Sequence, residues 1–194
     1  KSQIHVISNG IDPDFKYRKI PKEPKYADKF LILMIGRMSV EKKQEVFLEG
    51  VMKSKYRDNI QVILAGKGPT YKKIRRLGDK MPNPAVIDFY TKNQLIDVIS
   101  MCDLYVHSAH VEIEAMSCME AFAGGLVPII ADSKKSATKQ FALDDRSLFE
   151  DGNTDQLAQK IDYWYEHPEE KQKMEHEYAE SAKKYLLDSC VRQC

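Results

Sequence analysis

Residues 30–35 read FLILMI, an unbroken apolar run that ends at Gly36. A short run of this kind next to a turn residue predicts a strand that is buried on both faces. Further short runs of aliphatic and aromatic residues follow at 60–65, 85–89, 104–107 and 127–131. Stretches with helical periodicity separate them, at 41–56, 71–80, 93–102 and 114–123. This alternation predicts an α/β fold with a doubly wound parallel sheet and right-handed crossovers.

The pattern changes after Asp132. A polar loop at 133–136 precedes a short predicted strand at 146–149, and two charged helices follow at 155–165 and from 168 to about 187. Asn153 suits the cap of the first helix, and Pro168 suits the first turn of the second. Met174, Tyr178, Ala182 and Tyr185 are spaced to pack inward. We therefore divide the chain into a linker with an initial strand (1–29), the sheet domain (30–152) and C-terminal helices (153–194).

The composition limits the function classes. The chain has 194 residues, of which 43% are hydrophobic, enough for one buried core. The 30 basic and 29 acidic residues give a net charge of +1, which argues against a general nucleic-acid surface. No apolar run approaches the roughly 20 residues that a membrane span needs. The four cysteines, at 102, 118, 190 and 194, form no CxxC motif and are expected to be reduced thiols.

In a parallel sheet, ligands bind at the carboxyl ends of the strands, so the loops there hold the candidate site. Arg37 and Lys42 follow the first strand and surround a predicted helix start. A guanidinium, an ammonium and free helix amides suit a diphosphate. A solvated arginine beside a Glu–Lys surface pair is the alternative interpretation.

The loop after the second strand contains Gly66, Gly68 and Pro69. Glycines there allow a close backbone approach to a ligand, and the alternative is a tight strand-to-helix turn. A dinucleotide fingerprint would need a third glycine near position 71, which is tyrosine. A Walker loop would need serine or threonine after Lys67.

Glu112 and Glu120 lie where the fourth strand gives way to a helix. Ionised carboxylates only accept hydrogen bonds, so they suit the hydroxyl groups of a sugar. If both are helical they share one face, and if Glu112 is in the loop they can contact different parts of one ligand. Two surface glutamates are the alternative, but the helix is apolar, so a glutamate in it needs a buried partner or a ligand.

A metal site is not predicted. His107, His110, Glu112 and Glu114 fit no zinc-binding spacing. Asp12-Pro13-Asp14 follows Asn9-Gly10 and is interpreted as a turn in the linker.

Taken in order, several motifs between residue 4 and about residue 132 resemble the carboxy-terminal half of a family-4 retaining glycosyltransferase. They are Asn9-Gly10-Ile11-Asp12 with Phe15, Gly36-Arg37 with Glu41-Lys42, Ala65-Gly66 with Gly68-Pro69, the Glu112 and Glu120 pair with Gly124-Gly125, and Pro128-Ile129-Ile130. Such enzymes have the GT-B fold, in which two Rossmann-like domains face a cleft. The second domain holds the nucleotide-sugar donor.

The resemblance implies catalytic roles for Arg37 and Lys42 on the donor diphosphate and for Glu112 beside the transferred sugar. Glu120 would accept from the ribose hydroxyls, and the base would lie near Gly66 and the Tyr90-Thr91 turn. The full set of donor-binding residues implied is Gly36, Gly66, Gly68, Tyr90, Thr91, Glu114, Ala115, Met116, Ser117 and Glu120. No metal is implied, and the sugar would keep its anomeric configuration, with front-face attack on the donor.

The chain departs from the family pattern at three places. Ile113-Glu114-Ala115-Met116 stands where members usually have Gly-Phe-Gly-Leu, Lys43 stands where glycine is common, and the loop after Phe89 is shorter than usual. The tail at 133–138, 146–149 and 162–164 resembles bacterial members that build glycolipids or capsular polysaccharide.

We therefore expect a hexosyltransferase that moves glucose or galactose from a UDP-sugar to a lipid or glycan acceptor. It would act in the cytoplasm or peripherally at the inner face of the membrane. Because the chain opens with Lys1 and lacks an acceptor domain, the fragment alone is expected to be inactive. The alternatives are a noncatalytic sugar-nucleotide-binding module and an NAD-dependent Rossmann enzyme, which the missing third glycine disfavours.

Overall fold

The computed structural model describes residues 10–113 and 115–186. Within them, six strands form one sheet in the order β3-β2-β1-β4-β5-β6, and every neighbouring pair is parallel. The strands are β1 (Phe30–Ile35), β2 (Ile60–Ala65), β3 (Val86–Asp88), β4 (Leu104–His107), β5 (Pro128–Asp132) and β6 (Leu148–Glu150). The order reverses between β1 and β4, which is where parallel sheets of this type bind ligands.

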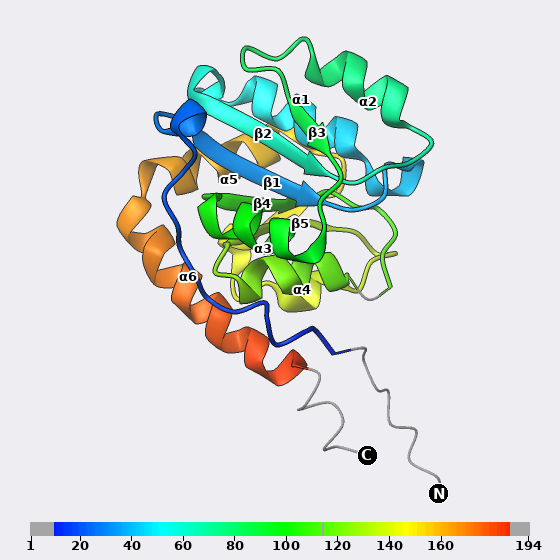
Figure 1. Ribbon diagram of the computed structural model, residues 1–194. Helices are drawn as coiled ribbons and strands as arrows, with labels where there is room; N and C mark the ends of the chain where they lie inside the picture. Colours follow the sequence, from blue (N-terminus) through cyan, green and yellow to red (C-terminus); the bar gives the residue numbers. More distant parts are fainter. Residues whose placement is uncertain (1–9, 114, 187–194) are drawn as a thin grey trace, which may run out of the picture.

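Helices cover both faces of the sheet (Figure 1). They are α1 (Gln44–Lys53), α2 (Tyr71–Gly78), α3 (Lys92–Met101), α4 (Met116–Ala123), α5 (Thr154–Glu166) and α6 (Pro168–Ala182). α1 packs against α2 and α5, while α4 packs against α6. The predicted doubly wound parallel sheet is therefore confirmed.

The central strands are buried because helices cover both of their faces. β2 is buried at every residue, and β1 is buried from Leu31 to Met34. Fully burying one such aliphatic side chain contributes about 1.5–3 kcal/mol. Close helix contacts depend on small residues. A Cβ added at Gly50 of α1 would lie 2.6 Å from Leu157 Cδ2 of α5. We infer that Gly50→Ala would push these two helices apart.

Two predicted helices begin later than expected. The helix predicted at 41–56 spans only 44–53, because Val40–Lys42 is a separate 3₁₀ turn and Lys43 is left-handed at φ 48°. The helix predicted at 114–123 begins at Met116, after Ala115, which also has φ 48°. Both breaks lie in the loops of the candidate site. They reorient the backbone at the starts of α1 and α4, where the first amides of a helix have no partner within it.

The other boundaries differ by one or two residues. The Asn153 side chain caps α5 by accepting from Gln156 N, and Pro168 opens α6, as predicted. Met174, Tyr178 and Ala182 are buried as expected. The exception is the last helix, predicted to run to about residue 187: α6 ends at Ala182, and a 3₁₀ turn at Lys183–Tyr185 follows it. The initial strand of the linker, expected at residues 4–7, lies outside the described residues.

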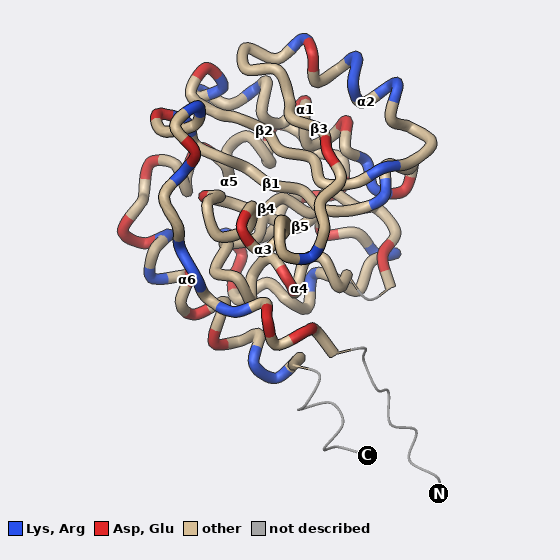
Figure 2. Tube along the Cα trace, viewed as in Figure 1, with Lys and Arg blue, Asp and Glu red and all other residues tan. Residues whose placement is uncertain are grey.

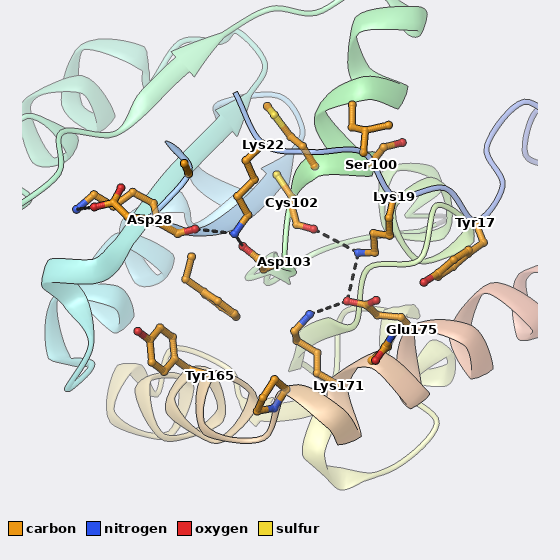
Figure 3. Close-up of a pocket in the computed structure, with 17 residues that line it drawn as sticks. Tyr17, Lys19, Lys22, Asp28, Ser100, Cys102, Asp103, Tyr165, Lys171 and Glu175 are labelled. Atoms are coloured by element: carbon orange, nitrogen blue, oxygen red, sulfur yellow. Dashed lines mark hydrogen bonds and ion pairs between the residues drawn. The ribbon is translucent and has the colours of Figure 1, made fainter. Parts of the chain in front are cut away.

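The segment 10–29 is held to the rest of the domain by α6 and by the start of β4. Tyr17 stacks on His176 with ring centroids 4.2 Å apart. Figure 3 shows a cavity of about 690 Å³ at the amino ends of β1 and β4. In it, Glu175 pairs with Lys19 at 3.2 Å and with Lys171 at 2.6 Å, and Lys22 pairs with Asp103 at 2.6 Å. Because its carboxylates already face ammonium groups, this cluster anchors the segment.

The turn predicted at Asp12-Pro13-Asp14 is present, with Phe15 N donating to Asp12 O at 3.0 Å. Cys102 and Cys118 are buried free thiols, as expected, and the other two cysteines lie outside the described residues. Acidic and basic residues alternate over most of the surface, although α2 carries only basic charges (Figure 2). Among the described helices, none has the length and hydrophobicity needed to cross a bilayer.

Candidate functional site

The loops after β1, β2 and β4 meet at the carboxyl edge of the sheet. Gly36 N donates to Ala65 O at 3.0 Å, and Met38 N donates to Lys67 O at 2.9 Å. On the other side, His110 N donates to Glu41 O at 2.8 Å. These bonds place the loop after β1 between the other two, as expected for consecutive parallel strands in this order.

The glycines after β2 are required by the neighbouring loop. A Cβ at Gly66, whose φ is +156°, would lie 2.1 Å from Gly36 O, and one at Gly68 would lie 2.1 Å from Met38 O. The sequence suggested a close approach to a ligand. In the structure the close approach is to the backbone of residues 36–38, since that loop occupies the space a side chain would need.

Lys42 and Glu112, two of the three predicted catalytic residues, form an ion pair. Their side chains come from different loops, and both line a cavity of about 590 Å³ together with Ile113, Ala115, Met116 and Ser117. Arg37, the third, has an exposed side chain that does not line this cavity and forms no ion pair within the described residues. Its carbonyl accepts from Gln44 Nε2 at 2.9 Å, which fixes the loop backbone.

Glu112 is held on its loop by the segment after β5. Glu112 N donates to Lys135 O at 3.4 Å, and Ala137 N donates to Glu112 O at 3.1 Å. Burial alone would raise the pKa of Glu112, but His107 and Lys42 outweigh this effect and lower the pKa to about 2. Glu112 is therefore ionised throughout the neutral range and is presented to the cavity on a fixed backbone.

A second set of contacts fixes the loop just before Glu112. Ser133 Oγ donates to His110 O at 2.6 Å, and His110 Nδ1 lies against Asp151 Oδ2. Asp151 also faces Lys43 Nζ at 3.5 Å. The end of β6 thus ties together the loops that carry Lys42 and Glu112.

Glu120 lies on α4 while Glu112 lies in the loop, which is the second of the two arrangements predicted from the sequence. Within the described residues, the Glu120 carboxylate has no hydrogen bond and no ion pair. Burial, with a smaller contribution from Asp12, raises its pKa to about 7. A partly buried carboxylate without a partner is costly unless a ligand supplies donors, so this position is consistent with a binding role.

A cavity of about 410 Å³ lies beside the loop after β2. It is lined by Gly66, Lys67, Gly68, Tyr71, Ile87, Asp88 and Phe89. Phe89 is 60% exposed, with Lys67 Nζ 4.8 Å from its ring centroid. Because the ring lines a cavity and is open to solvent, it offers a face on which a ligand could stack. Phe89 and Tyr71 were not among the residues predicted from the sequence, where Phe89 is the last residue of the strand predicted at 85–89.

Tyr90 and Thr91, which were predicted near the base, do not line that cavity. Tyr90 packs on the core, and burial raises the pKa of its hydroxyl to about 12. Thr91 is the N-cap of α3 and forms a reciprocal capping box with Gln94. Both side chains are engaged within the domain, Tyr90 in core packing and Thr91 in capping α3, so neither faces this cavity.

The remaining predicted residues lie near the start of α4. Ala115 precedes the helix, and Met116 and Ser117 form its first turn and line the cavity with Lys42. First-turn amides have no partner within a helix and are oriented to receive an anion. Glu114 lies outside the described residues. No cluster of three or more potential metal ligands occurs in the part of the chain that the structure describes.

The sheet order and this edge, with its cations, carboxylates and helix start, define a doubly wound domain suited to a phosphorylated polyol. The chain belongs to the family of glycosyl transferases group 1, whose model matches residues 15–185. It is also similar to the catalytic domain of cholesterol-alpha-glucosyltransferase from Helicobacter pylori, with 49% identity and a TM-score of 0.78. That match covers 80% of this chain and 98% of the other.

More distant structures share the fold. The C-terminal domain of a glycosyl transferase group 1 family protein from Francisella tularensis is 19% identical, with a TM-score of 0.74, over 92% of this chain and all of that domain. HepE from Anabaena, in complex with UDP and glucose, is 18% identical with a TM-score of 0.78, over 97% of this chain. The match covers 55% of HepE, so the chain spans about half of that protein. A comparison with curated proteins gave no significant match.

Proposed function

We propose that this chain is the donor-binding part of a retaining glucosyltransferase, which moves glucose from UDP-glucose to a hydroxyl group of a sterol or another lipid. The observation that carries the proposal is the Lys42–Glu112 ion pair beside the start of α4. It brings a cation suited to phosphate and a carboxylate suited to sugar hydroxyls into one cavity.

Lys42 and Arg37 would neutralise the diphosphate, together with the first-turn amides of α4. Two side-chain cations and a helix N-terminus supply positive charge without a metal ion, and they stabilise the charge that develops on the leaving diphosphate. Binding should therefore be unchanged by a chelator such as EDTA. A loss of affinity with EDTA that Mg²⁺ restores would contradict this part of the proposal.

Glu120 would accept hydrogen bonds from the ribose hydroxyls, and the base would lie against Phe89 and the glycine loop. Glu112 would accept from hydroxyl groups of the glucose. This assignment uses the two carboxylates on different parts of one extended ligand, as their positions in loop and helix allow.

The choice of glucose and of a lipid acceptor rests on the relatives. The relative with 49% identity is a glucosyltransferase that acts on cholesterol, and the HepE complex contains UDP and glucose. UDP-glucose is an α-linked donor, so an α-glucoside product corresponds to retention. Such a reaction belongs to glycolipid synthesis and would take place on a membrane face, with acceptor contacts supplied outside the described residues.

The direct test is calorimetric titration of the chain with UDP-glucose, UDP-galactose, ADP-glucose and NAD. We expect UDP-glucose to bind most tightly and NAD not to bind. Arg37→Ala and Lys42→Ala should each weaken binding by about 1.5–3 kcal/mol, the range for charged hydrogen bonds. If the double variant binds UDP-glucose as tightly as the unaltered chain, the assignment of Arg37 and Lys42 to the diphosphate is wrong.

A noncatalytic sugar-nucleotide-binding module would use the same cavity and would pass the binding test. Transfer distinguishes the two. With the acceptor-binding domain present, the enzyme should convert UDP-glucose and a sterol to a sterol α-glucoside. Tight binding without any transfer to lipid or glycan acceptors would favour the noncatalytic module.

A further inference from the structure

His107, the last residue of β4, has an imidazole that is fully buried directly behind Glu112. Its Nε2 has no hydrogen-bond partner among the described residues, and it lies 3.6 Å from Glu112 Oε2. This distance is too long for a hydrogen bond but short enough for an ion pair. An unpaired ring nitrogen in a buried site is costly, so its direction toward a catalytic carboxylate requires an explanation.

The contacts of the other ring nitrogen, Nδ1, are compatible with both the neutral and the protonated imidazole. Tyr105 Oη lies 3.3 Å from His107 Nδ1 and 3.4 Å from Ser117 Oγ. If the imidazole is neutral, the Tyr105 hydroxyl can donate to Nδ1. If the imidazole is protonated, Nδ1–H donates to Tyr105 Oη, and the hydroxyl donates to Ser117 instead. Protonation of His107 therefore needs only rotation of one hydroxyl group.

Glu112 has two basic neighbours, the Lys42 ammonium and the His107 imidazole, and the donor competes for Lys42. Lys42 contacts Glu112 from the cavity side, where the diphosphate is proposed to bind, while His107 approaches from the protein interior. A ligand with two negative charges attracts the Lys42 ammonium and leaves Glu112 less well paired. A partly buried carboxylate that loses its cation favours any nearby group that can become positive.

We propose that His107 is a positioning residue that takes up a proton when the donor binds, and that it then holds Glu112 in place of Lys42. The proton comes from solvent and is added to the imidazole. The imidazolium donates through Nε2 to Glu112 and through Nδ1 to Tyr105. Glu112 thus stays ionised and fixed toward the sugar hydroxyls while Lys42 serves the diphosphate. This inference rests on the proposed donor site.

The charges around His107 give the direction of the change. Burial lowers the pKa of His107 in the free chain, and Lys42 adds to this, while Glu112 acts in the opposite direction. The other titratable neighbours, Tyr105 and Cys118, are buried, and burial raises the pKa of each. They remain neutral and contribute no charge at neutral pH. Moving Lys42 away and adding the negative diphosphate both raise the pKa of His107, so binding should take up a proton.

The test is the number of protons exchanged per molecule of UDP-glucose bound, measured by calorimetry in buffers with different ionisation enthalpies. Glu120 titrates at the same site, so the measurement uses chains that carry Glu120→Gln. Between about pH 5 and 8, where histidine titrates, the chain with His107 should take up a fraction of a proton, up to one. The chain that also carries His107→Gln should take up none.

His176→Gln is the matched control, because His176 stacks on Tyr17 in the anchoring segment away from this cavity. It should leave the proton uptake unchanged. If His107→Gln prevents folding, the ¹⁵N shifts of the His107 ring, recorded with and without UDP-glucose, report its protonation in the intact chain. Uptake that persists in folded His107→Gln, or ring shifts that do not move on binding, would overturn the inference. Failure of the unaltered chain to bind UDP-glucose would instead overturn the proposed function.

Discussion

Glu120 offers the sharpest test of how the donor is bound. Both oxygens of the ionised carboxylate can accept from the ribose hydroxyls, whereas protonation turns one of them into a donor, and burial raises the pKa of this group to about 7 in the free chain. The donor should therefore bind the ionised form more tightly and stabilise it. Affinity that depends on Glu120 should rise with pH until the group is fully ionised.

The test variant is Glu120→Gln. The measured quantity is the affinity of the unaltered chain for UDP-glucose divided by the affinity of the variant. UDP-glucose is the right ligand because both phosphates are esterified and do not titrate near neutrality. The ionised fraction of a group with a pKa near 7 changes about tenfold between pH 6 and pH 8. At pH 8 the ratio should be about 10 to 150, from 1.5–3 kcal/mol for a charged hydrogen bond, and at pH 6 about tenfold smaller.

Taking the ratio removes the contribution of His107 and of every other group that titrates in both chains. A ratio that does not change with pH would refute the reasoning, because Glu120 would then not be the titrating group. A ratio near one at pH 8 would refute the ribose contact itself. Affinity for inorganic pyrophosphate is the internal control and should be similar in the two chains, since it has no ribose.

The same pKa shift has a consequence for the free chain. A carboxyl whose pKa is raised on folding makes the native state bind more protons than the unfolded state, so stability falls as pH rises from 4.5 to about 7. Glu120→Gln should remove this fall and raise the free energy of unfolding at pH 8 by up to about 3 kcal/mol. Urea unfolding at pH 4 and pH 8 measures it. A variant that is less stable at pH 8 would show that Glu120 has a partner in the fold.

Three further predictions concern other parts of the molecule. Lys42→Met should weaken UDP-glucose binding about 10-fold or more in calorimetry and should also lower thermal stability, because it leaves the partly buried Glu112 carboxylate without its ammonium partner. Ala115→Gly should raise the free energy of unfolding by about 1 kcal/mol, since φ 48° strains alanine, whereas Ala123→Gly, equally buried but helical, should lower it by a similar amount. Glu175→Gln should cost about 1.5–3 kcal/mol in urea unfolding because it removes a buried carboxylate that pairs with two lysines, while Glu166→Gln in an exposed pair should cost less than about 1.

The sheet was predictable because its signal is local. Continuous apolar runs such as residues 30–35 identify buried parallel strands, and helical stretches between them leave little choice of topology. The helix starts at the site were not predictable from periodicity, because Lys43 and Ala115 belong to good helical patterns and become left-handed only in the folded loops. Glycine is what a left-handed position favours. Two of the departures from the family pattern, at Lys43 and in the run that contains Ala115, include these two backbone positions.

The placement of Lys42 and Glu112 at the same edge of the sheet followed from the general rule that strand ends meet there, but their ion pair was not predicted. The position of His107 behind them did not follow. A histidine at the end of an apolar strand looks the same in sequence whether it faces the core or a carboxylate. Likewise, Tyr90 packs on the core and Phe89 is exposed, although they are adjacent residues of similar character that both follow β3.

Glu112 and Glu120 are eight positions apart and are kept in opposite states by their surroundings. Lys42 and His107 hold Glu112 ionised with a pKa of about 2, while burial without a partner raises the pKa of Glu120 to about 7. Donor binding changes both environments, since it draws Lys42 from Glu112 and brings hydroxyl donors to Glu120. The first change takes up a proton at His107, and the second releases one from Glu120. Because these contributions have opposite signs, the unaltered chain should bind UDP-glucose with little net proton exchange near neutrality. Glu120→Gln should then reveal uptake, and His107→Gln should reveal release. If both variants take up protons on binding, or both release them, the coupling is contradicted, because uptake is assigned to His107 and release to Glu120.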